Sequence, residues 1–318
     1  MFYCVKHETL QTGWQGDDGM VDEYNSFLKQ HQNNKGFLLL YRTLKVWLNL
    51  FYPVYARLAP RRGLDPNADF VVSLTSFPAR IGTTHLVIET LMRQRVRPRA
   101  ILLWLAEEQF PEKKLPRRLT RLERFGLSIR WCEDLKSHKK YYYTMREFPE
   151  LTVITADDDM FYPESWTEKL VETADAYPDL IVCYKAERAR FGSDGNILPY
   201  DDWDDAVDAD SPAYDLVPIG YKGILYPPHS LAQDVFDKDF FMVAECRNDD
   251  LWLKTMSLVA DSRVVVAEGG DVPYITLFAV NKDALYKINV NEKQNDVQLK
   301  RFFARYGDAW LRLKQKDT

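Results

Sequence analysis

Three consecutive aspartates, Asp157, Asp158 and Asp159, directly follow a short apolar segment at residues 153–156. Adjacent carboxylates repel one another unless a cation or abundant water screens their charge. In an extended backbone Asp157 and Asp159 point to the same side, so both can meet one cation while Asp158 braces the loop. Oxygen ligands favour Mg²⁺ or Mn²⁺. The triplet therefore predicts a metal site, with an acidic turn before a helix near Pro163 as the alternative.

The triplet ends the last of four predicted strands that alternate with helices. The strands are expected at 70–75, 100–105, 127–132 and 151–155. Strands spaced in this way predict an α/β fold with a mixed, mostly parallel sheet and helices on both faces. Ligands of such sheets bind outside the carboxyl ends of the strands. The first candidates for a site are therefore the polar residues at 73–76, 132–134 and 157–159.

The place of this Asp-x-Asp resembles the signature of glycosyltransferases of the Rossmann-like GT-A fold. Residues 68–300 are more widely similar to bacterial polysaccharide-assembly and capsule-assembly enzymes, which are family 2-like glycosyltransferases. The resemblance implies that a divalent ion, held by Asp157 and Asp159, bridges the diphosphate of a sugar nucleotide and stabilises the departing nucleoside diphosphate. The matching segments are 73–81, 134–137, 155–159, 225–228 and 248–253.

The resemblance also implies an acceptor-side carboxylate that removes a proton from the attacking hydroxyl when the reaction inverts configuration. Asp249 and Asp250 resemble the acidic pair that precedes an apolar helix in inverting family 2 enzymes, although Asn248 stands where those often carry Glu. The sequence does not distinguish Asp249 from Asp250. Capping of the helix by Asn248 or Asp249 is the alternative interpretation.

The turn after the first strand offers hydroxyls, amides and a guanidinium, which suit a ribose or a diphosphate. Asp134 can accept a hydrogen bond from a base or ribose, and nearby lysines can meet the diphosphate. The alternative for Lys139 and Lys140 is a solvated helix start. The predicted donor-binding residues are Thr75, Ser76, Arg80, Asp134, Lys136, Lys139 and Asp158.

Several other residues near the expected site have possible roles in binding a metal or a substrate. Many metal-dependent relatives supply a third ligand from a histidine, but here only His229 follows the triplet, and a turn is the stronger interpretation for it. Residues 220–223 suggest a close approach of the backbone to substrate. Trp203 can stack on an acceptor sugar, within an acidic run that reads as a solvated loop. Four polar residues are expected to close the donor pocket: Asn289, Asn291, Asn295 and Asp296.

The composition narrows the class of protein. Among 318 residues, 42 Lys and Arg stand against 47 Asp and Glu, a net charge of −5, which argues against nucleic-acid binding through a basic surface. Four scattered cysteines without a C-x-x-C pair favour a reducing compartment. No uncharged apolar stretch is long enough to span a membrane, and residues 1–19 lack the pattern of a secretory signal.

Residues 1–65 are expected to form a separate N-terminal extension. A polar leader with at most one short helix precedes a stretch at 35–63 that carries six basic residues and no acid, interleaved with Leu, Trp, Phe and Tyr and broken at Pro53. Such a helix suits the headgroup layer of an anionic membrane, through residues 37–62, or else covers the core. The expected location is the cytoplasm, at the inner face of the plasma membrane.

The remainder, 66–318, is predicted to be the catalytic domain, with a nucleotide-sugar half at 66–160 and an acceptor half at 161–318. The predicted activity is metal-dependent transfer of a sugar from a nucleotide-diphosphate donor to a glycan or lipid-linked acceptor in bacterial surface polysaccharide synthesis, with inversion. A non-catalytic carbohydrate-binding or sugar-nucleotide-binding protein is the first alternative. An Asp-nucleophile phosphatase is disfavoured because its Asp-x-Asp normally follows the first strand. A pyrophosphorylase is disfavoured because residues 73–81 contain no glycine.

Overall fold

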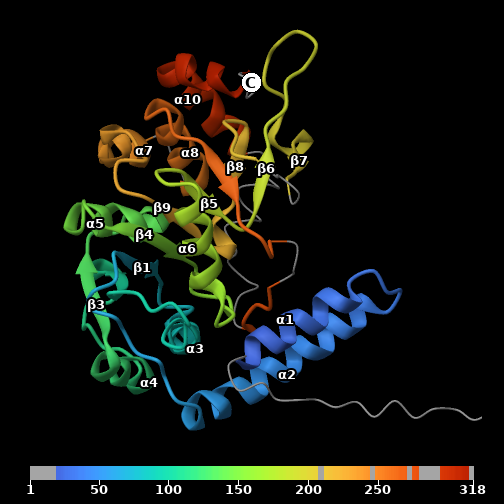
Figure 1. Cartoon of the computed structure of the whole chain (residues 1–318). Coiled ribbons are helices and arrows are strands. Elements are labelled where there is room, and N and C mark those ends of the chain that lie inside the picture. Colours follow the sequence, from blue (N-terminus) through green and yellow to red (C-terminus); the bar gives the residue numbers. More distant parts are fainter. Residues whose placement is uncertain (1–18, 207–210, 244–247, 271–273, 279–293, 315–318) are drawn as a thin grey trace, which may run out of the picture.

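The computed structural model describes residues 19–206, 211–243, 248–270, 274–278 and 294–314. Its centre is a seven-stranded sheet in the order β10-β5-β9-β4-β1-β2-β3 (Figure 1). Neighbouring strands are parallel except where β9 pairs with β4 and β5. The predicted α/β class with a mostly parallel sheet is confirmed, and the arrangement is consistent with a Rossmann-like GT-A fold. The strands are β1 (Phe70–Thr75), β2 (Ile101–Ala106), β3 (Leu127–Cys132), β4 (Thr152–Ala156), β5 (Ile181–Cys183), β9 (Ile224–Tyr226) and β10 (Val264–Val266).

Alternate side chains of β1 pack against helices on opposite faces of the sheet. Val72 and Leu74 belong to the core that contains α3 (Ile81–Leu91), whereas Val71 packs with residues of α5 (Lys139–Glu147). On the same side as Val71, the Ser73 hydroxyl donates to the Lys140 carbonyl at 2.5 Å. Since both faces are covered, the strand can be apolar along almost its whole length.

The second half of the chain adds a layer over one end of this sheet (Figure 1). A small antiparallel sheet, in the order β7-β6-β8, packs there with three helices around a second core that includes Trp252 and Phe302. These elements are β6 (Ala186–Arg188), β7 (Asp204–Asp205), β8 (Leu216–Pro218), α7 (Lys238–Val243), α8 (Asp249–Val259) and α10 (Gln294–Trp310). The helices α4 (Arg117–Thr120) and α6 (Trp166–Ala176) belong to the first core.

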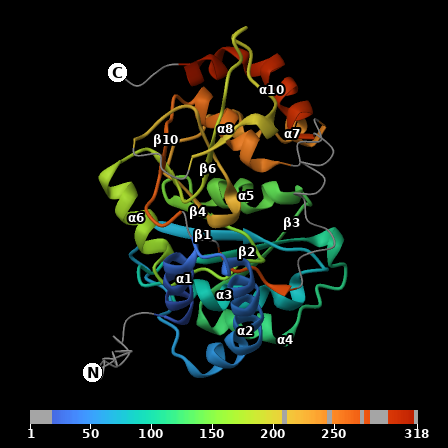
Figure 2. The same cartoon turned by 90° about the vertical axis from the view of Figure 1, so that its right-hand side faces the viewer.

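Two helices, α1 (Met20–His31) and α2 (Phe37–Leu58), lie together on the outside of the molecule (Figures 1 and 2). The predicted break at Pro53 is wrong, because α2 continues through it. A proline inside a helix removes one hydrogen bond, but the buried Tyr52 and Ala56 on either side fix this segment against the core. The single short helix expected in the leader corresponds to α1, and residues 1–18 lie outside the described residues.

Three strands of the large sheet, β5, β9 and β10, were not predicted. Each is three residues long, which is too short to show a period of two. The helix expected from Leu115 to Gly126 is α4 followed by the 3-10 helix η2 (Arg121–Phe125). Among the helices that the structure describes, none is long and apolar enough to cross a membrane.

One buried cation should limit the stability of this fold. Lys254 in α8 is 1% exposed, its Nζ has no hydrogen-bond partner among the described residues, and burial lowers its pKa to about 7 from the ordinary 10.5. Between these two values the unfolded chain binds more protons than the folded one, so this group makes stability rise with pH across that window.

We expect Lys254→Met to raise the melting temperature by several degrees at neutral pH and to flatten that rise, because a well-packed apolar side chain replaces an unpartnered charge. Thermal unfolding between about pH 6 and pH 9 measures both effects. Lys169→Met, at an exposed position of α6, is the control and should change the melting temperature little. A less stable Lys254→Met protein would contradict the prediction.

Candidate functional site

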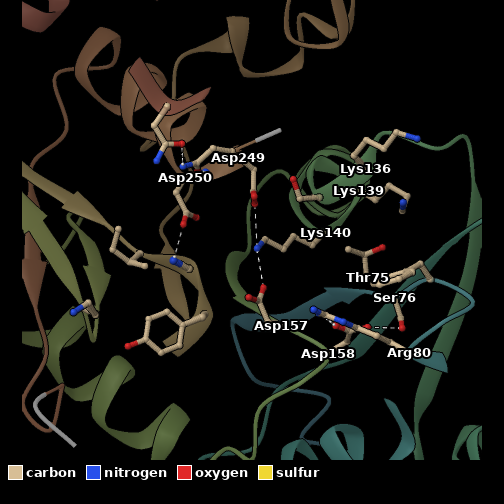
Figure 3. A pocket seen from close by; sticks show the side chains of 18 of the residues that line it. Thr75, Ser76, Arg80, Lys136, Lys139, Lys140, Asp157, Asp158, Asp249 and Asp250 are labelled. Atoms are coloured by element: carbon tan, nitrogen blue, oxygen red, sulfur yellow. Dashed lines mark hydrogen bonds and ion pairs between the residues drawn. The ribbon is translucent and has the colours of Figure 1, made fainter. Parts of the chain in front are cut away.

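A cavity of about 830 Å³ opens where β1 and β4 end, and its volume suits a small-molecule site. Figure 3 shows the two acidic groups on opposite sides of it, with Lys140 between them. Segments far apart in the sequence are therefore brought together as the parallel sheet predicts. The predicted site residues that line the cavity are Thr75, Ser76, Arg80, Lys136, Lys139, Asp157, Asp158, Asp249 and Asp250. Asp134 and Asp159 lie next to lining residues without belonging to the lining.

Asp158 is held by the turn that follows β1. Ser76 Oγ donates to its Oδ2 at 2.5 Å, and Arg80 Nη1 contacts its Oδ1 at 2.8 Å. The same guanidinium lies 3.1 Å from Asp159 Oδ2. Burial raises the pKa of Asp158, and the charge of Arg80 opposes this effect. Arg80 therefore ties the turn after β1 to the turn after β4.

Asp157 and Asp159 differ in their access to the cavity. Asp157 lines it and is 32% exposed, whereas the Asp159 side chain is more buried. Burial and the charge of Asp157 raise the pKa of Asp159 to about 7. The backbone carbonyl of Asp159 accepts a hydrogen bond from the Leu277 amide at 2.8 Å, which fixes the loop. The negative charge of the triplet is thus only partly compensated by the chain.

Lys140, near the start of α5, connects the two acidic groups. Its Nζ lies 3.0 Å from Asp157 Oδ1 and 3.1 Å from Asp249 Oδ2 (Figure 3). Burial alone would lower the pKa of this lysine, but the charges of Asp157 and Asp249 raise it well above its ordinary value. A buried ammonium therefore joins the end of β4 to the start of α8.

The acidic pair of α8 lies in the first turn of the helix. Asn248 is the N-cap, because its Oδ1 accepts from the amides of Asp250 and Leu251 at 3.0 and 3.3 Å. The alternative interpretation, in which Asn248 caps the helix, is therefore confirmed, and both aspartates also line the cavity. Negative side chains at this end of a helix are favourable in addition.

Asp249 and Asp250 differ in charge state. Burial would raise the pKa of Asp249, but Lys140 outweighs it and holds that pKa below its ordinary value. For Asp250, burial and the neighbouring Asp249 raise the pKa to about 7. The Gly220 amide donates to Asp250 Oδ2 at 2.9 Å, while the buried Oδ1 has no hydrogen-bond partner within the described chain. A Cβ on Gly220 would lie 2.7 Å from that Oδ1, so a glycine is needed at this contact.

Asp134 gathers the basic residues of the cavity. Lys136 Nζ and Lys139 Nζ lie 2.5 and 2.6 Å from its two oxygens. Burial opposes ionisation, but these lysines lower the pKa of Asp134 to about 2. Asp134 thus positions the lysines. The alternative of a solvated helix start at Lys139 and Lys140 is wrong, because both side chains are buried.

Thr75, another predicted donor-binding residue, lines the cavity, and its Oγ1 donates to the Trp104 carbonyl at 2.8 Å.

Aromatic side chains form the far part of the cavity wall. Trp203 and Tyr200 pack with their ring centres 4.8 Å apart, and Tyr221 lies on the same wall. Rings of this kind offer apolar faces with polar edges, which suit a sugar. In the acidic run around Trp203, Asp204 and Asp205 form the exposed strand β7.

The polar residues predicted near the C-terminus are partly described. Asn295 lines the cavity, and its Oδ1 accepts from Asn248 Nδ2 at 3.0 Å. The Asp296 carboxylate accepts from the Tyr200 amide at 2.8 Å. Asn289 and Asn291 lie outside the described residues.

The carboxylates near the cavity decide whether it can hold a divalent ion. In the part of the chain that the structure describes, no three His, Cys, Asp or Glu residues are grouped to hold a metal. His229 is an exposed turn residue with a φ of 62°, 3.6 Å from Glu150. Asp157 and Asp159 nevertheless fit a cation, because their charge is incompletely neutralised. Phosphate oxygens and water would supply the other ligands.

No family model matches this sequence, and no curated protein matches it. Among solved structures, the chain is similar to a mannosyltransferase of Pyrobaculum calidifontis in complex with GDP-Man and Mn²⁺, at 12% identity and a TM-score of 0.43, over 89% of this chain and 75% of that one. It is similar to residues 1–349 of S. aureus TarS at 12% identity and a TM-score of 0.36, over 78% and 76%. A CMP-2-keto-3-deoxy-manno-octonic acid synthetase complexed with CTP has 13% identity and a TM-score of 0.38, over 72% and 100%. At such values the chemistry must be argued from the residues of this chain.

The sequence did not reveal that Lys140 bridges the two acidic groups or that Gly220 orients Asp250. In the sequence, Lys140 is marked only by the three tyrosines that follow it, which indicate that the start of this helix packs against the sheet. Glu187 on β6 and Lys185, the residue before this strand, also line the cavity and were not predicted. The strand is three residues long, and no pattern in the sequence marked it.

Lys140→Met should destabilise the protein by about 3–5 kcal/mol, because it leaves Asp157 and Asp249 facing each other without a cation. Urea unfolding measures the loss. Adding Asp249→Asn should recover part of it, since one of the two unpaired charges is removed. The control is Lys136→Met, whose lysine is 58% exposed and should contribute less than about 1 kcal/mol. Equal small losses for both lysines would show that the bridge contributes little.

Proposed function

We propose that this chain is a metal-dependent glycosyltransferase that moves a sugar from a nucleotide-diphosphate donor to a glycan or lipid-linked acceptor. The observation that supports this most is the arrangement of two separate carboxylate groups across one cavity. One group, with basic residues beside it, suits a diphosphate and its ion. The other carries a carboxylate oxygen that has no partner in the described part of the chain, and aromatic rings also line the cavity.

On the donor side, Asp157 and Asp159 would hold Mn²⁺ or Mg²⁺. When bound, such an ion stabilises the charge that develops on the departing nucleoside diphosphate. Lys136 and Lys139, positioned by Asp134, add positive charge beside the phosphates. Ser76 and Arg80 hold Asp158 and so fix the loop that presents Asp157.

On the acceptor side, Asp250 is the general base of the proposed reaction. Its carboxylate, on the cavity wall, accepts the proton of the attacking hydroxyl, and a pKa of about 7 allows proton transfer near neutral pH. The Gly220 amide fixes the orientation of the carboxylate. Asp249 stays ionised beside Lys140 and positions that ammonium. A base placed opposite the donor site suits a single displacement with inversion.

The described extension also bears on where the enzyme works. One side of α2 exposes Leu39, Trp47, Leu50 and Leu58. With the basic residues among 35–62, this side suits the surface of an anionic membrane. We place the enzyme at the inner face of a bacterial plasma membrane, where it would act in surface polysaccharide synthesis. The extension at 1–65 would serve attachment, and 66–318 would be the catalytic domain.

Donor binding can be tested without knowing the acceptor. UDP, GDP or CDP should raise the melting temperature in the presence of Mn²⁺ and do so less in EDTA, because ligands that bind the folded state stabilise it. In Asp157→Asn the Mn²⁺-dependent part of the shift should disappear, whereas Asp204→Asn, on the exposed strand β7, should retain it. An unchanged shift in Asp157→Asn would reject the metal role of that residue.

The assignment of the base is tested by Asp250→Asn. Transfer of sugar from the donor to lipid and glycan acceptors extracted from bacterial membranes should fall about 100-fold or more, with the donor-induced melting shift retained. Asp249→Asn should reduce transfer less, because Asp250 remains. Full loss in Asp249→Asn with activity kept in Asp250→Asn would reverse the assignment. Nucleotide binding without transfer in the unmodified chain, over many acceptors, would favour a non-catalytic binding protein.

A further inference from the structure

A second cavity, of about 190 Å³, lies where α2, α3 and α4 meet. Arginines from three different elements line it: Arg57 near the end of α2, Arg118 in α4 and Arg121 at the start of η2. His85 and Glu89 of α3 form the wall between them. No role in the proposed transfer reaction uses this cavity.

The cavity carries positive charge that the described chain does not neutralise. Glu89, the acid of the lining, is already paired twice, with Arg61 at 2.6 Å and with Arg93 at 2.7 Å. Arg57, Arg118 and Arg121 make no ion pair with any described residue. Burial lowers the pKa of His85, and the charge of Arg118 lowers it further. Three guanidinium groups around one small cavity suit a phosphate, whose oxygens match their paired N–H donors.

The exposed apolar side of α2 continues up to this cavity. The exposed apolar residues on this side are called the apolar stripe here: Leu39, Val46, Trp47, Leu50, Phe51, Val54 and Leu58. Arg57 follows Leu50 by seven residues, which is two helical turns, and so lies on the same side of α2. Figures 1 and 2 both show the end of α2 close to α4. A surface on which the apolar stripe rests therefore also meets the arginine cavity.

We propose that the arginine cavity binds the phosphate of an anionic membrane lipid while the apolar stripe lies in the headgroup layer. The proposal rests on the peripheral membrane contact proposed above and gives it one defined lipid site. Free phosphate would satisfy the guanidinium groups alone. The neighbouring stripe favours the lipid, because Trp47 and Phe51, stacked 4.0 Å apart, are amphipathic or apolar rings typical of the interfacial region.

The test uses the full chain and sedimentation with vesicles of phosphatidylcholine, with or without about 30% phosphatidylglycerol. The double variant Arg118→Gln/Arg121→Gln should bind the anionic vesicles at least about tenfold more weakly than the unmodified chain. The matched control Arg117→Gln/Arg124→Gln removes the same charge from the same two elements outside the cavity and should lose less than about threefold. Arg57→Gln, on another helix, should reproduce the cavity effect.

Several results would overturn the proposal. Equal losses in the two double variants would show diffuse attraction without a site. Failure of the unmodified chain to bind anionic vesicles would remove the membrane contact itself. If inorganic phosphate raises the melting temperature of the unmodified chain but not of Arg118→Gln/Arg121→Gln, while both proteins bind vesicles equally, the cavity is a site for free phosphate. Vesicle binding that depends on the charge of the cavity but survives Trp47→Ser/Leu50→Ser unchanged would remove the role of the stripe.

The outcome is separable from that of the proposed transferase. Arg118→Gln/Arg121→Gln should keep the melting temperature and the nucleotide-induced shift, because neither arginine lines the large cavity or forms an ion pair with a residue that the structure describes. If the unmodified chain binds vesicles as expected but no nucleotide, the transferase proposal fails and the lipid site stands. If the unmodified chain binds nucleotide, but the cavity variant and its control bind anionic vesicles equally, only the lipid site fails.

Discussion

The arrangement of the large cavity depends on the two ion pairs that the Lys140 ammonium forms with Asp157 and Asp249. Without a cation between them, Asp157 and Asp249 would repel each other in a poorly solvated space. Lys140 is presented by α5, which packs directly on β1 through Ser73 and Thr144. The chain therefore carries its own positive charge between the two acidic groups. A bound donor and ion would add to an electrostatic balance that the fold has already established.

The N-terminal helices are part of this fold. Arg93, one of the most buried large side chains, donates to the carbonyls of Ala56 and Ala59 at 2.8 and 3.0 Å and also pairs with Glu89. The end of α2 is thereby bound to α3, which begins just after the turn that contains Ser76 and Arg80. An orientation imposed on α2 by a surface would be transmitted through α3 to the central sheet.

The sequence predicted the parts of the molecule that follow a clear period or a strong local signal. The apolar runs at 70–75 and 127–132 match β1 and β3 residue for residue. The acid triplet and the pair at 249–250 were placed correctly relative to these elements. Pro53 misled the prediction, because packing of α2 against the core outweighs one missing backbone hydrogen bond.

The contacts inside the site could not be predicted in this way. Arg80, in the turn after a different strand, pairs with Asp158 and Asp159 and leaves Asp157 to Lys140. The buried positions of Lys139 and Lys140 follow from tertiary pairing with Asp134, Asp157 and Asp249. Such pairings join residues that are distant in sequence, and a single sequence contains no pattern that specifies them.

The bond between Asn248 and Asn295 has a consequence for how the protein is made. Asn248 caps the helix that carries Asp249 and Asp250, and its side-chain amide donates to a residue of α10, the last long helix described. Contacts between such distant segments form slowly, because the intervening chain must first close on itself. On the ribosome, the segment from β1 to β4 can fold while synthesis continues, but the part of the cavity wall that contains Asn295 cannot form until the chain beyond residue 295 has emerged.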